Sequence, residues 1–436
     1  MHLRKLTVAL LTALLPLSAL ADSTTGTSLS IVGTPGPGRQ ISAHVVVTGK
    51  HLVTGPGHTV VGGTVQVSVN GVLTAQVAAA WPFNSNLTDS GCVQFDQYGG
   101  CIRTKYISSN TDVTIPVTLP TGMANAQVTA RYTGDTDSHS SDSAPVTLAL
   151  GKSPDLYWIK PVGTGTGTTE VHILDAASNY STFKLHTGTA LHEANPDQWA
   201  FAIGDANGDG KTDVYAISRY GNGTPNVEVH VLDGATNYST YLGNYSTALP
   251  SVDGGLAWTF DVADFNQDGV PDLYAFRKSG GGSGHTEVHI YSGKDGFQTV
   301  LGHFVMPMPP VGIDDSWEFH TAYMDGDNIP DVVAVAKQNG ATTEVHVVSG
   351  SSNYGSYSLE TTTALAATGT SSLWVFGVND YERDGFNDLF AITKSGANGL
   401  EVHALRGPMF QEFNLHATTP IEALPSDASQ TILINK

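Results

Sequence analysis

Four copies of one acidic loop limit the folds open to this chain more than any other feature. In each copy, oxygen-bearing side chains occupy loop positions 1, 3, 5 and 9, as in the copy that runs from Asp205 to Asp213. A short turn whose alternate side chains point inward suits Ca²⁺, which takes roughly 6 to 8 oxygen ligands. The sequence therefore predicts a loop that binds a hard cation, and it predicts this loop four times.

The predicted ligands of each loop are its oxygen-bearing side chains together with the backbone carbonyl at position 7. They are Asp205, Asn207, Asp209, Lys211 and Asp213; Asp264, Asn266, Asp268, Val270 and Asp272; Asp325, Asp327, Ile329 and Asp331; and Asp380, Glu382, Asp384, Phe386 and Asp388. In the third loop Tyr323 stands at position 1 and Asn328 replaces the glycine at position 6. We therefore expect up to four Ca²⁺ sites, the Tyr323 loop being the weakest.

An EF-hand begins with the same spacing, but the residues after these loops exclude an EF-hand. An EF-hand needs a bidentate Glu at position 12 and a helix on each side. Position 12 is Ala216, Ala275, Ala334 or Ala391 in this chain, and the flanking residues alternate like strands. The loops also recur at a longer period than the paired loops of dockerin-type modules.

The closing residue of each loop sets a regular period. The aspartates Asp155, Asp213, Asp272, Asp331 and Asp388 lie 58, 59, 59 and 57 residues apart. A period of this length indicates propeller blades or a solenoid, and the four alternating apolar segments in each unit are the content of one blade.

The run from Trp258 through Phe260 to Asp264-Phe-Asn-Gln-Asp-Gly-Val-Pro-Asp272 resembles the FG-GAP or VCBS repeat of integrin-like propellers. The resemblance implies that the acidic loop joins the innermost strand of a blade to its second strand. It also implies that the first unit, which begins at Asp155, lacks an innermost strand, and we expect the lone alternating strand at residues 430–435 to supply it. It leads us to expect an all-β fold in which residues 151–436 form five blades closed by the C-terminal strand, although integrin propellers have seven. Completion of an open array by a second copy of the chain is the alternative.

The first 21 residues have the pattern of an export signal. Arg4 and Lys5 precede an apolar run over residues 6–20, which ends in Ala19-Leu20-Ala21, a small-x-small cleavage motif. We therefore expect a secreted, extracellular protein, or a periplasmic one, with no transmembrane segment once the signal is removed.

Residues 22–150 are predicted to form a second kind of β-domain. About seven short strands with an Asn70-Gly71 hairpin turn indicate a β-sandwich. The run Ala130-Arg-Tyr132-Thr-Gly134-Asp135 followed by Val146-Thr-Leu148 resembles the end of bacterial Ig-like repeat domains. Because an exported chain meets an oxidising compartment, its only two cysteines, Cys92 and Cys101, are predicted to form a local disulfide.

The sequence Glu-Val-His occurs once in every unit. Its polar members are Glu170 and His172, Glu228 and His230, Glu287 and His289, Glu344 and His346, and Glu401 and His403. Strand alternation places each Glu and His on one face and the intervening valine on the other. Two interpretations stay open: hydrogen-bonded pairs between blades, or repeated contacts to glycan hydroxyl groups. One Glu and one His from each blade are too few ligands for zinc.

A row of aromatic residues recurs in the same register. Trp199, Trp258, Trp317 and Trp374 each precede a Phe by two residues, which predicts an apolar layer between neighbouring blades. Trp158 lies outside this register and is the better candidate for an exposed aromatic side chain.

These features favour a binding protein over an enzyme. The chain has no nucleophile elbow, no His-Glu-x-x-His motif and no catalytic cysteine pattern. Its formal charge of −20 argues against nucleic acid as a partner. We expect a calcium-stabilised binding or adhesion protein that recognises carbohydrate or another cell-surface component. A polysaccharide-active lyase or hydrolase and a purely structural surface module are the alternatives.

Overall fold

The computed structural model describes residues 25–436 except 34, 36–38, 53–62, 80–91, 96, 99–100, 105, 121–124, 136–138, 151–153, 222, 253–256 and 428. The export signal predicted for residues 1–21 lies outside these residues. The chain forms two compact units, of which the first ends at Thr147, while the second comprises Gly33–Ile41, Thr118–Ala126 and Leu148–Lys436. Within the described residues, no helix has the length and apolar character that crossing a membrane requires.

The described residues before 150 contain ten strands. The strands are β1 (Thr25–Val32), β2 (Gln40–Leu52), β3 (Thr64–Val69), β4 (Val72–Ala78), β5 (Cys92–Phe95), β6 (Cys101–Thr104), β7 (Tyr106–Thr118), β8 (Asn125–Tyr132), β9 (Ser141–Asp142) and β10 (Val146–Ala149). They form the sheets β1-β2-β7, β10-β8-β3-β4 with β9 beside β8, and β5-β6. Alternate residues of β3 and β8 are buried, as expected for a sheet with one face in a core.

The predicted disulfide falls on the small hairpin of this region. Cys92 lies in β5 opposite Thr104, and Cys101 lies in β6 opposite Phe95. The two side chains lie outside the described part of the structure, so their disulfide remains a prediction.

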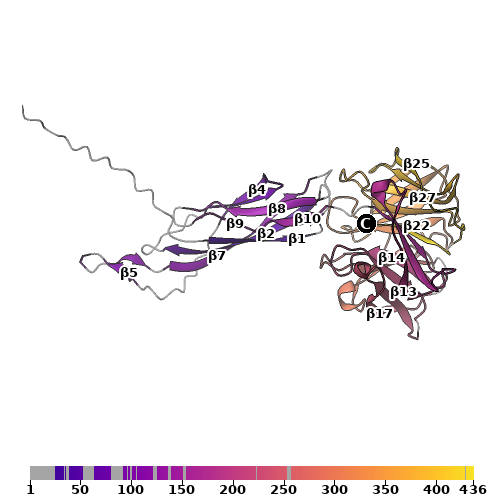
Figure 1. Ribbon diagram of the computed structural model, residues 1–436, viewed down its shortest axis with the longest axis horizontal. Coiled ribbons are helices and arrows are strands. Elements are labelled where there is room, and N and C mark those ends of the chain that lie inside the picture. The colour runs from indigo at the N-terminus through magenta and orange to yellow at the C-terminus, as the bar shows by residue number, and fades with distance from the viewer. Residues whose placement is uncertain are drawn as a thin grey trace, which may run out of the picture. The chain divides into compact units, whose positions relative to one another are not determined.

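The described residues after 155 are all-β apart from three short 3₁₀ turns (Figure 1). They form five four-stranded antiparallel sheets. Sheet 1 contains β11 (Leu156–Lys160), β12 (Thr168–Leu174), β13 (Phe183–His192) and β30 (Thr431–Ile434). Sheet 2 contains β14 (Trp199–Gly204), β15 (Asp213–Ser218), β16 (Asn226–Leu232) and β17 (Tyr241–Pro250), and sheet 3 contains β18 (Trp258–Ala263), β19 (Asp272–Arg277), β20 (Glu287–Tyr291) and β21 (Val300–Val305). Sheet 4 contains β22 (Trp317–Ala322), β23 (Asp331–Ala336), β24 (Thr342–Val348) and β25 (Tyr357–Ala366), and sheet 5 contains β26 (Trp374–Asn379), β27 (Asp388–Gly396), β28 (Gly399–Leu405) and β29 (Phe413–Thr418).

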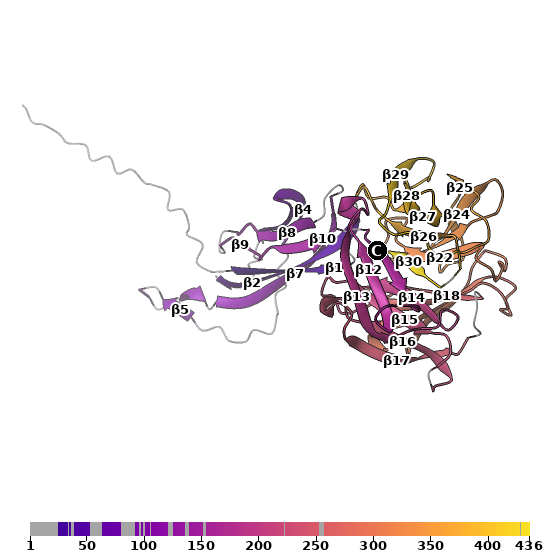
Figure 2. The same ribbon diagram turned by 45° about the vertical axis from the view of Figure 1, so that its right-hand side comes forward.

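The C-terminal strand completes the first sheet, in the position that the sequence predicts for it. β30 pairs antiparallel with β11, so Leu156 lies opposite Ile434. Figure 2 shows β30, in yellow, among the magenta strands of the earlier sheets. Sheets 2 to 5 are each built from four consecutive strands. Sheet 1 therefore joins residues that are far apart in the chain.

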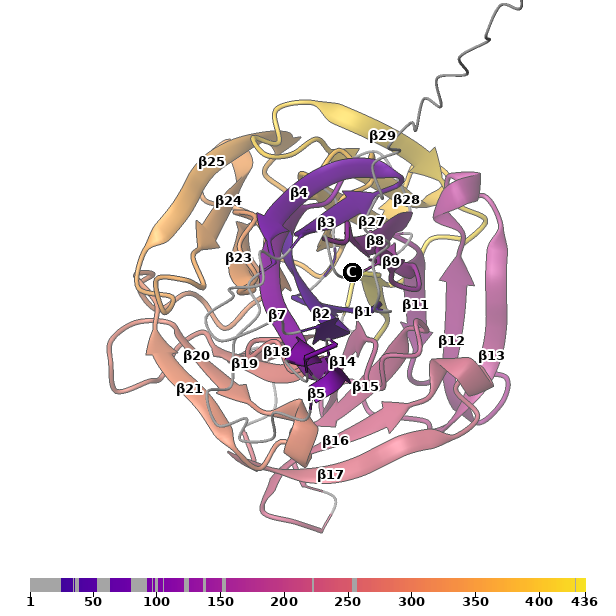
Figure 3. The ribbon, with the colours of Figure 1, turned by 90° about the vertical axis from the view of Figure 1, so that its left-hand side faces the viewer.

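The five sheets surround a common centre, with their fourth strands β13, β17, β21, β25 and β29 at the periphery (Figure 3). Each sheet shares an apolar cluster with the next: Val229 of sheet 2, for example, packs in one cluster with Phe260 and Val262 of sheet 3. A cluster also joins sheet 5 to sheet 1, where Val402 packs with Ile432 and Ile434. Trp199, Trp258, Trp317 and Trp374 pack against the clusters of their sheets, which confirms their predicted place in the layers between sheets.

A buried cation links each sheet from the second to the fifth to its successor, and this link was not predicted from the sequence. Lys278 donates from Nζ to the backbone carbonyls of Asp314 (2.7 Å) and Trp317 (3.0 Å) at the start of sheet 4. The equivalent residues are Arg219, which donates to Trp258, Lys337, which donates to Trp374, and Lys394, which donates to Gln430. All four lie six residues after a closing aspartate, and this constant spacing is the signal that would have found them.

Replacement of Lys278 by Met tests this link. Lys278 is fully buried, so Met would preserve most of its volume and leave two partly buried carbonyl groups without this donor. We expect the free energy of unfolding at pH 7 to fall by about 2 kcal/mol, because the lost hydrogen bonds outweigh the relief from burying a charge. Urea unfolding measures this loss, and Lys294→Met, at a side chain that is 64% exposed, is the control.

The loss of stability in Lys278→Met should also depend on pH. Burial lowers the pKa of Lys278 to about 8, below the value of about 10.4 in an unfolded chain. Between these values the unfolded wild-type chain binds more protons than the folded one, so wild-type stability rises with pH. The variant lacks this gain, and its deficit should therefore be larger at pH 10 than at pH 7. A deficit that shrinks as the pH rises would contradict the assignment.

Candidate functional site

The four acidic loops lie where the resemblance implies, between the first and second strands of sheets 2 to 5. In the first loop, the carboxylate of Asp205 accepts the backbone N–H groups of Gly208 and Gly210, each at 2.9 Å. Asp264 and Asp380 accept the N–H groups at positions 5 and 6 of their own loops. The glycine at position 6 has φ of +83° in the first loop, which only a residue without Cβ adopts at little cost. The carboxylate at position 1 thus holds the turn closed through hydrogen bonds to its backbone.

The closing aspartate of each loop has a second role. Both oxygens of Asp213, which is fully buried, accept backbone N–H groups: Oδ2 from Ala206 at loop position 2 and Oδ1 from Gly234 after the third strand, each at 2.8 Å. Asp272, Asp331 and Asp388 make the same two contacts in their sheets. The carboxylate therefore joins the loop between strands 1 and 2 to the turn between strands 3 and 4. We call this pair of contacts the bracket.

Asp155 shows that half of this bracket occurs without an acidic loop. It precedes the second strand of sheet 1, where no acidic loop occurs, yet its Oδ1 accepts the N–H of Ala176 at 3.0 Å. Its Oδ2 accepts a hydrogen bond from Nζ of Lys184 at 2.8 Å. The contact between this aspartate and the turn after the third strand is therefore present in all five sheets.

Negative charge is crowded in the loops. Burial, together with the charges of Asp205 and Asp209, raises the pKa of Asp213 to about 6. Burial likewise raises the pKa of Asp272 and Asp388 to about 6 and that of Asp331 to about 7. A divalent cation would offset this crowding. The donor set is made only of oxygen, which is the set that Ca²⁺ prefers.

The Tyr323 loop differs from the other three because a guanidinium group lies against it. Arg39, which belongs to the same compact unit, lies 3.9 Å from the centre of the Tyr323 ring. Its Nη2 donates to the carbonyl oxygen of Asp327 and to Oδ1 of Asn328, each at 2.7 Å. Both residues that depart from the loop pattern, Tyr323 and Asn328, thus contact Arg39.

Each Glu of the Glu-Val-His repeat contacts its own sheet. Glu228 accepts from Oγ1 of Thr224 in the preceding hairpin at 2.8 Å, and its Oε2 lies 3.3 Å from Nε2 of His230. Glu170, Glu287, Glu344 and Glu401 likewise accept hydrogen bonds from their hairpins. The ring of His230 lies 5.2 Å from that of Trp199. These contacts hold a hairpin, a strand and the tryptophan layer together, and binding of glycans at these residues stays a prediction.

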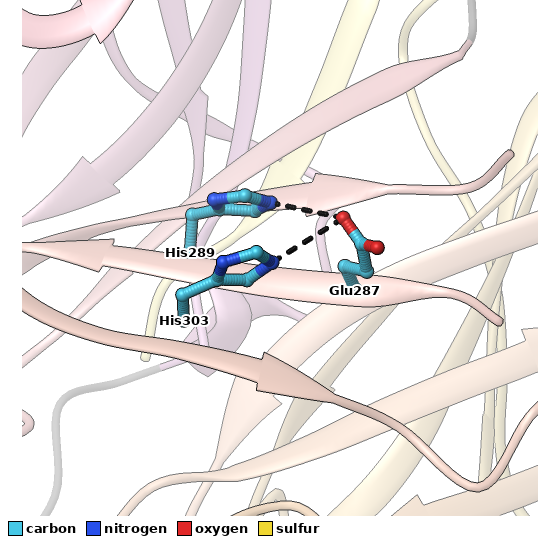
Figure 4. A group of neighbouring side chains, drawn as sticks. All are labelled: Glu287, His289 and His303. Atoms are coloured by element: carbon cyan, nitrogen blue, oxygen red, sulfur yellow. Dashed lines mark hydrogen bonds and ion pairs between the residues drawn. The ribbon is translucent and has the colours of Figure 1, made fainter. Parts of the chain in front are cut away.

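Sequence reasoning missed the third polar residue of this row, which lies on the fourth strand opposite each histidine. It is His186, Asn244, His303, Glu360 or His416. In sheet 3 this residue brings three metal-ligating groups together, because Glu287, His289 and His303 converge (Figure 4). The signal available from the sequence was the recurrence of a polar residue on the fourth strand, 13 or 14 positions after each histidine.

Sheet 1 carries its tryptophan on the second strand, whereas the other four sheets carry theirs on the first. Gln430 precedes β30 at the place where the other sheets carry Trp on their first strand. Trp158 stands on the second strand, where the others have Ala216, Ala275, Ala334 or Ala391. The indole Nε1 of Trp158 donates to Oε1 of Gln430 at 2.9 Å, and its ring lies 4.5 Å from that of His172. Trp158 is half-buried, so the expected exposed aromatic is only partly accessible.

A cleft of about 410 Å³ lies beside Trp158 and Gln430. It is lined by Trp158, Lys160, Phe183 and Gln430 of sheet 1 and by the segment from Pro420 to Pro425 that follows sheet 5. Its volume falls within the roughly 300–1,000 Å³ typical of small-molecule sites. It combines aromatic walls with an amine, an amide and the carboxylate of Glu422.

The chain resembles known proteins in one segment. Residues 205–275, which contain the first two acidic loops, match the FG-GAP-like repeat family. No curated protein matches the chain in sequence.

Among solved structures, the chain is similar to AofleA from Arthrobotrys oligospora, with 9% identity, coverage of 95% of this chain and 94% of that one, and a TM-score of 0.35. It is also similar to an auxiliary nutrient binding protein from Bacteroides thetaiotaomicron, with 8% identity, coverage of 88% and 84%, and a TM-score of 0.27. An uncharacterized protein from Listeria monocytogenes matches with 12% identity, coverage of 70% and 20%, and a TM-score of 0.20. At such TM-scores the likenesses do not establish a shared fold.

Two substitutions in the second acidic loop separate the bracket from metal binding. Asp272→Ala leaves the N–H groups of Phe265 and Gly293 without their acceptor, so we expect a loss of about 3 kcal/mol in stability that persists in EGTA. Asp268→Ala removes a predicted Ca²⁺ ligand and leaves both bracket contacts of Asp272 in place. It should therefore destabilise the protein only when Ca²⁺ is present. Urea unfolding with and without EGTA distinguishes the two. A loss in Asp272→Ala that vanishes in EGTA would contradict the bracket.

Proposed function

We propose that residues 151–436 form a five-bladed, calcium-stabilised β-propeller of a secreted binding protein, preceded by an Ig-like sandwich. The propeller is supported by the five consecutive four-stranded sheets and by the apolar cluster between sheets 5 and 1. Secretion is supported by the basic and apolar pattern of residues 1–21. The protein is proposed to act outside the cell, or in the periplasm, as a recognition or adhesion module.

The proposed calcium sites are the loops that begin at Asp205, Asp264 and Asp380. Each has a carboxylate at position 1 that accepts N–H groups and a further carboxylate at position 5. Glu382 of the last loop is engaged by Arg406 at 2.7 Å through both its oxygens, so this loop should bind less tightly than the other two. In the Tyr323 loop we propose that Arg39 supplies the positive charge and that Ca²⁺ is not required.

Calcium removal tests these sites. A site with a Kd of about 10⁻⁴ M would stabilise the folded protein by about 2.7 kcal/mol at about 10 mM Ca²⁺. We expect the melting temperature to fall when EGTA is added. Asp205→Ala and Asp264→Ala should each remove part of the difference, whereas Asp325→Ala in the Tyr323 loop should leave it unchanged. A melting temperature that is identical with Ca²⁺ and with EGTA would refute calcium stabilisation.

The ligand is proposed to be a carbohydrate that binds in the cleft at Trp158, and the observation that carries this proposal is the composition of the cleft. An indole ring offers an apolar face to the C–H groups of a sugar, while Lys160, Glu422 and Gln430 offer donors and acceptors to its hydroxyl groups. The Glu-Val-His residues are less suited to this role because their carboxylates already accept hydrogen bonds from their own hairpins.

A glycan array probed with the wild-type chain in Ca²⁺ would identify the sugar. We expect Trp158→Ala and Glu422→Ala to weaken binding of that sugar by about tenfold or more, since each removes a contact worth roughly 1–3 kcal/mol. Tyr220→Ala, at an exposed aromatic residue far from the cleft in sequence, is the control. Affinities equal to that of the wild type in both cleft variants would place the binding site elsewhere. Turnover of a polysaccharide by the purified chain would replace the binding function with an enzymatic one.

A further inference from the structure

Sheet 3 carries a cluster of three side chains that the acidic loops and the cleft do not explain. Glu287 and His289 lie on β20, and His303 lies on β21 directly opposite His289. Strand alternation places Glu287 and His289 on the same face. Figure 4 shows the two imidazole rings side by side, with the carboxylate of Glu287 at their Nε2 edges. The third group thus comes from the neighbouring strand.

The distances are those of a ligand set. Oε2 of Glu287 lies 3.4 Å from Nε2 of His289 and 3.3 Å from Nε2 of His303. The three groups offer ligand atoms that lie within 4.8 Å of one another. In a tetrahedral zinc site, with metal–ligand distances of about 2.0–2.2 Å, neighbouring ligand atoms are about 3.3–3.5 Å apart. An ion bound by all three groups would require the two imidazole rings to turn out of their stacked arrangement, so that both Nε2 lone pairs point at it.

The other sheets show that this convergence is not a general property of the repeat. In sheets 1 and 5 a second histidine also faces the first, but each pair meets through Nδ1 atoms, at 2.8 Å in sheet 1 and 2.7 Å in sheet 5. Their rings are steeply inclined, at 69° and 73°, whereas those of His289 and His303 are stacked at 20° with centroids 3.9 Å apart. Among the described residues, only sheet 3 brings three such groups together.

A hydrogen bond from the preceding hairpin orients the carboxylate of Glu287 towards the two histidines. Ser283 donates from Oγ to Oε1 at 2.6 Å, which directs Oε2 towards the two histidines. Hydrogen bonds of this kind fix the orientation of metal ligands in proteins. The hairpin also passes close to the carboxylate, because a Cβ at Gly281 would lie 2.4 Å from Oε1 of Glu287.

The cluster is closed on one side and open to solvent on the other. The side chain of Glu287 is 4% exposed, whereas that of His303 is 53% exposed. Nη1 of Arg277 lies 3.8 Å from Oε2 of Glu287 and opposes a bound cation. Its guanidinium group also lies against the Trp258 ring, so it is shared between two partners.

We propose that Glu287, His289 and His303 bind a first-row transition-metal ion, Zn²⁺ in the first instance, and leave one coordination position open to solvent. Two imidazoles and one carboxylate with an open position form a set that zinc accepts. Ca²⁺ prefers oxygen ligands only, so the site is chemically distinct from the acidic loops. The open position gives sheet 3 a place for a donor atom of a further ligand.

The test uses the full mature chain with any histidine tag removed, in excess Ca²⁺ so that the acidic loops are filled. Titration with Co²⁺ is followed by visible absorption, and titration with Zn²⁺ by calorimetry. We expect one equivalent of each ion per chain and the intense visible bands of four-coordinate Co²⁺. The absence of binding by the wild-type chain would overturn the proposal.

The variants locate the ion. His303→Asn gives sheet 3 the residues that sheet 2 has naturally, Glu228, His230 and Asn244, so it should fold, and thermal melting without Zn²⁺ checks this. It should abolish stoichiometric binding, as should Glu287→Gln. Ser283→Ala should weaken binding by about 10- to 100-fold.

His186→Asn in sheet 1 is the matched control, because it removes a histidine from a pair that does not converge with a carboxylate, and binding should be unchanged. Loss of binding in His186→Asn, or wild-type binding in His303→Asn and Glu287→Gln, would overturn the assignment.

Discussion

A buried carboxylate at the start of the second strand holds the turns of sheets 2 to 5 in place. Its two oxygens satisfy backbone N–H groups from segments about 7 residues before it and about 20 residues after it. A buried N–H group without a partner costs about 1–3 kcal/mol, so the carboxylate removes two such costs at once. In sheet 1, where the acidic loop is missing, Asp155 keeps the contact with the later turn and also accepts a hydrogen bond from Lys184. The contact with the later turn therefore does not depend on the acidic loop.

The two faces of each sheet contribute different residues to the layers between neighbouring sheets. The valine of each Glu-Val-His points towards the following sheet, and the Phe two residues after each Trp points towards the preceding one. The buried cations Arg219, Lys278, Lys337 and Lys394 add a polar link to four of the five layers, those that follow sheets 2 to 5. Apolar contacts hold neighbouring sheets together. Hydrogen bonds from the buried cations to specific carbonyl groups fix the position of one sheet relative to the next.

The features that recur in the sequence were the ones that could be predicted from it. The period of the aspartates indicated the number of sheets, and alternation in residues 430–435 indicated the partner strand of Leu156 to Ile159. Contacts that occur once were not predictable. Arg39 lies almost 290 positions from Asn328, and nothing in either segment indicates the other. The convergence of His303 with Glu287 and His289 depends on ring orientation, which distinguishes sheet 3 from sheet 1 although both contain the same three residue types.

The pairing of β30 with β11 has a consequence for the order in which the chain folds during its synthesis. Translation proceeds from the N-terminus, so β11, β12 and β13 leave the ribosome long before their fourth strand exists. Until residues 431–434 emerge, β11 presents an unpaired edge, which is a template for association with other chains. Sheets 2 to 5 have no such delay, because their strands are consecutive. Loss of the last few residues would therefore remove a strand from the first sheet and an apolar packing partner from the last one.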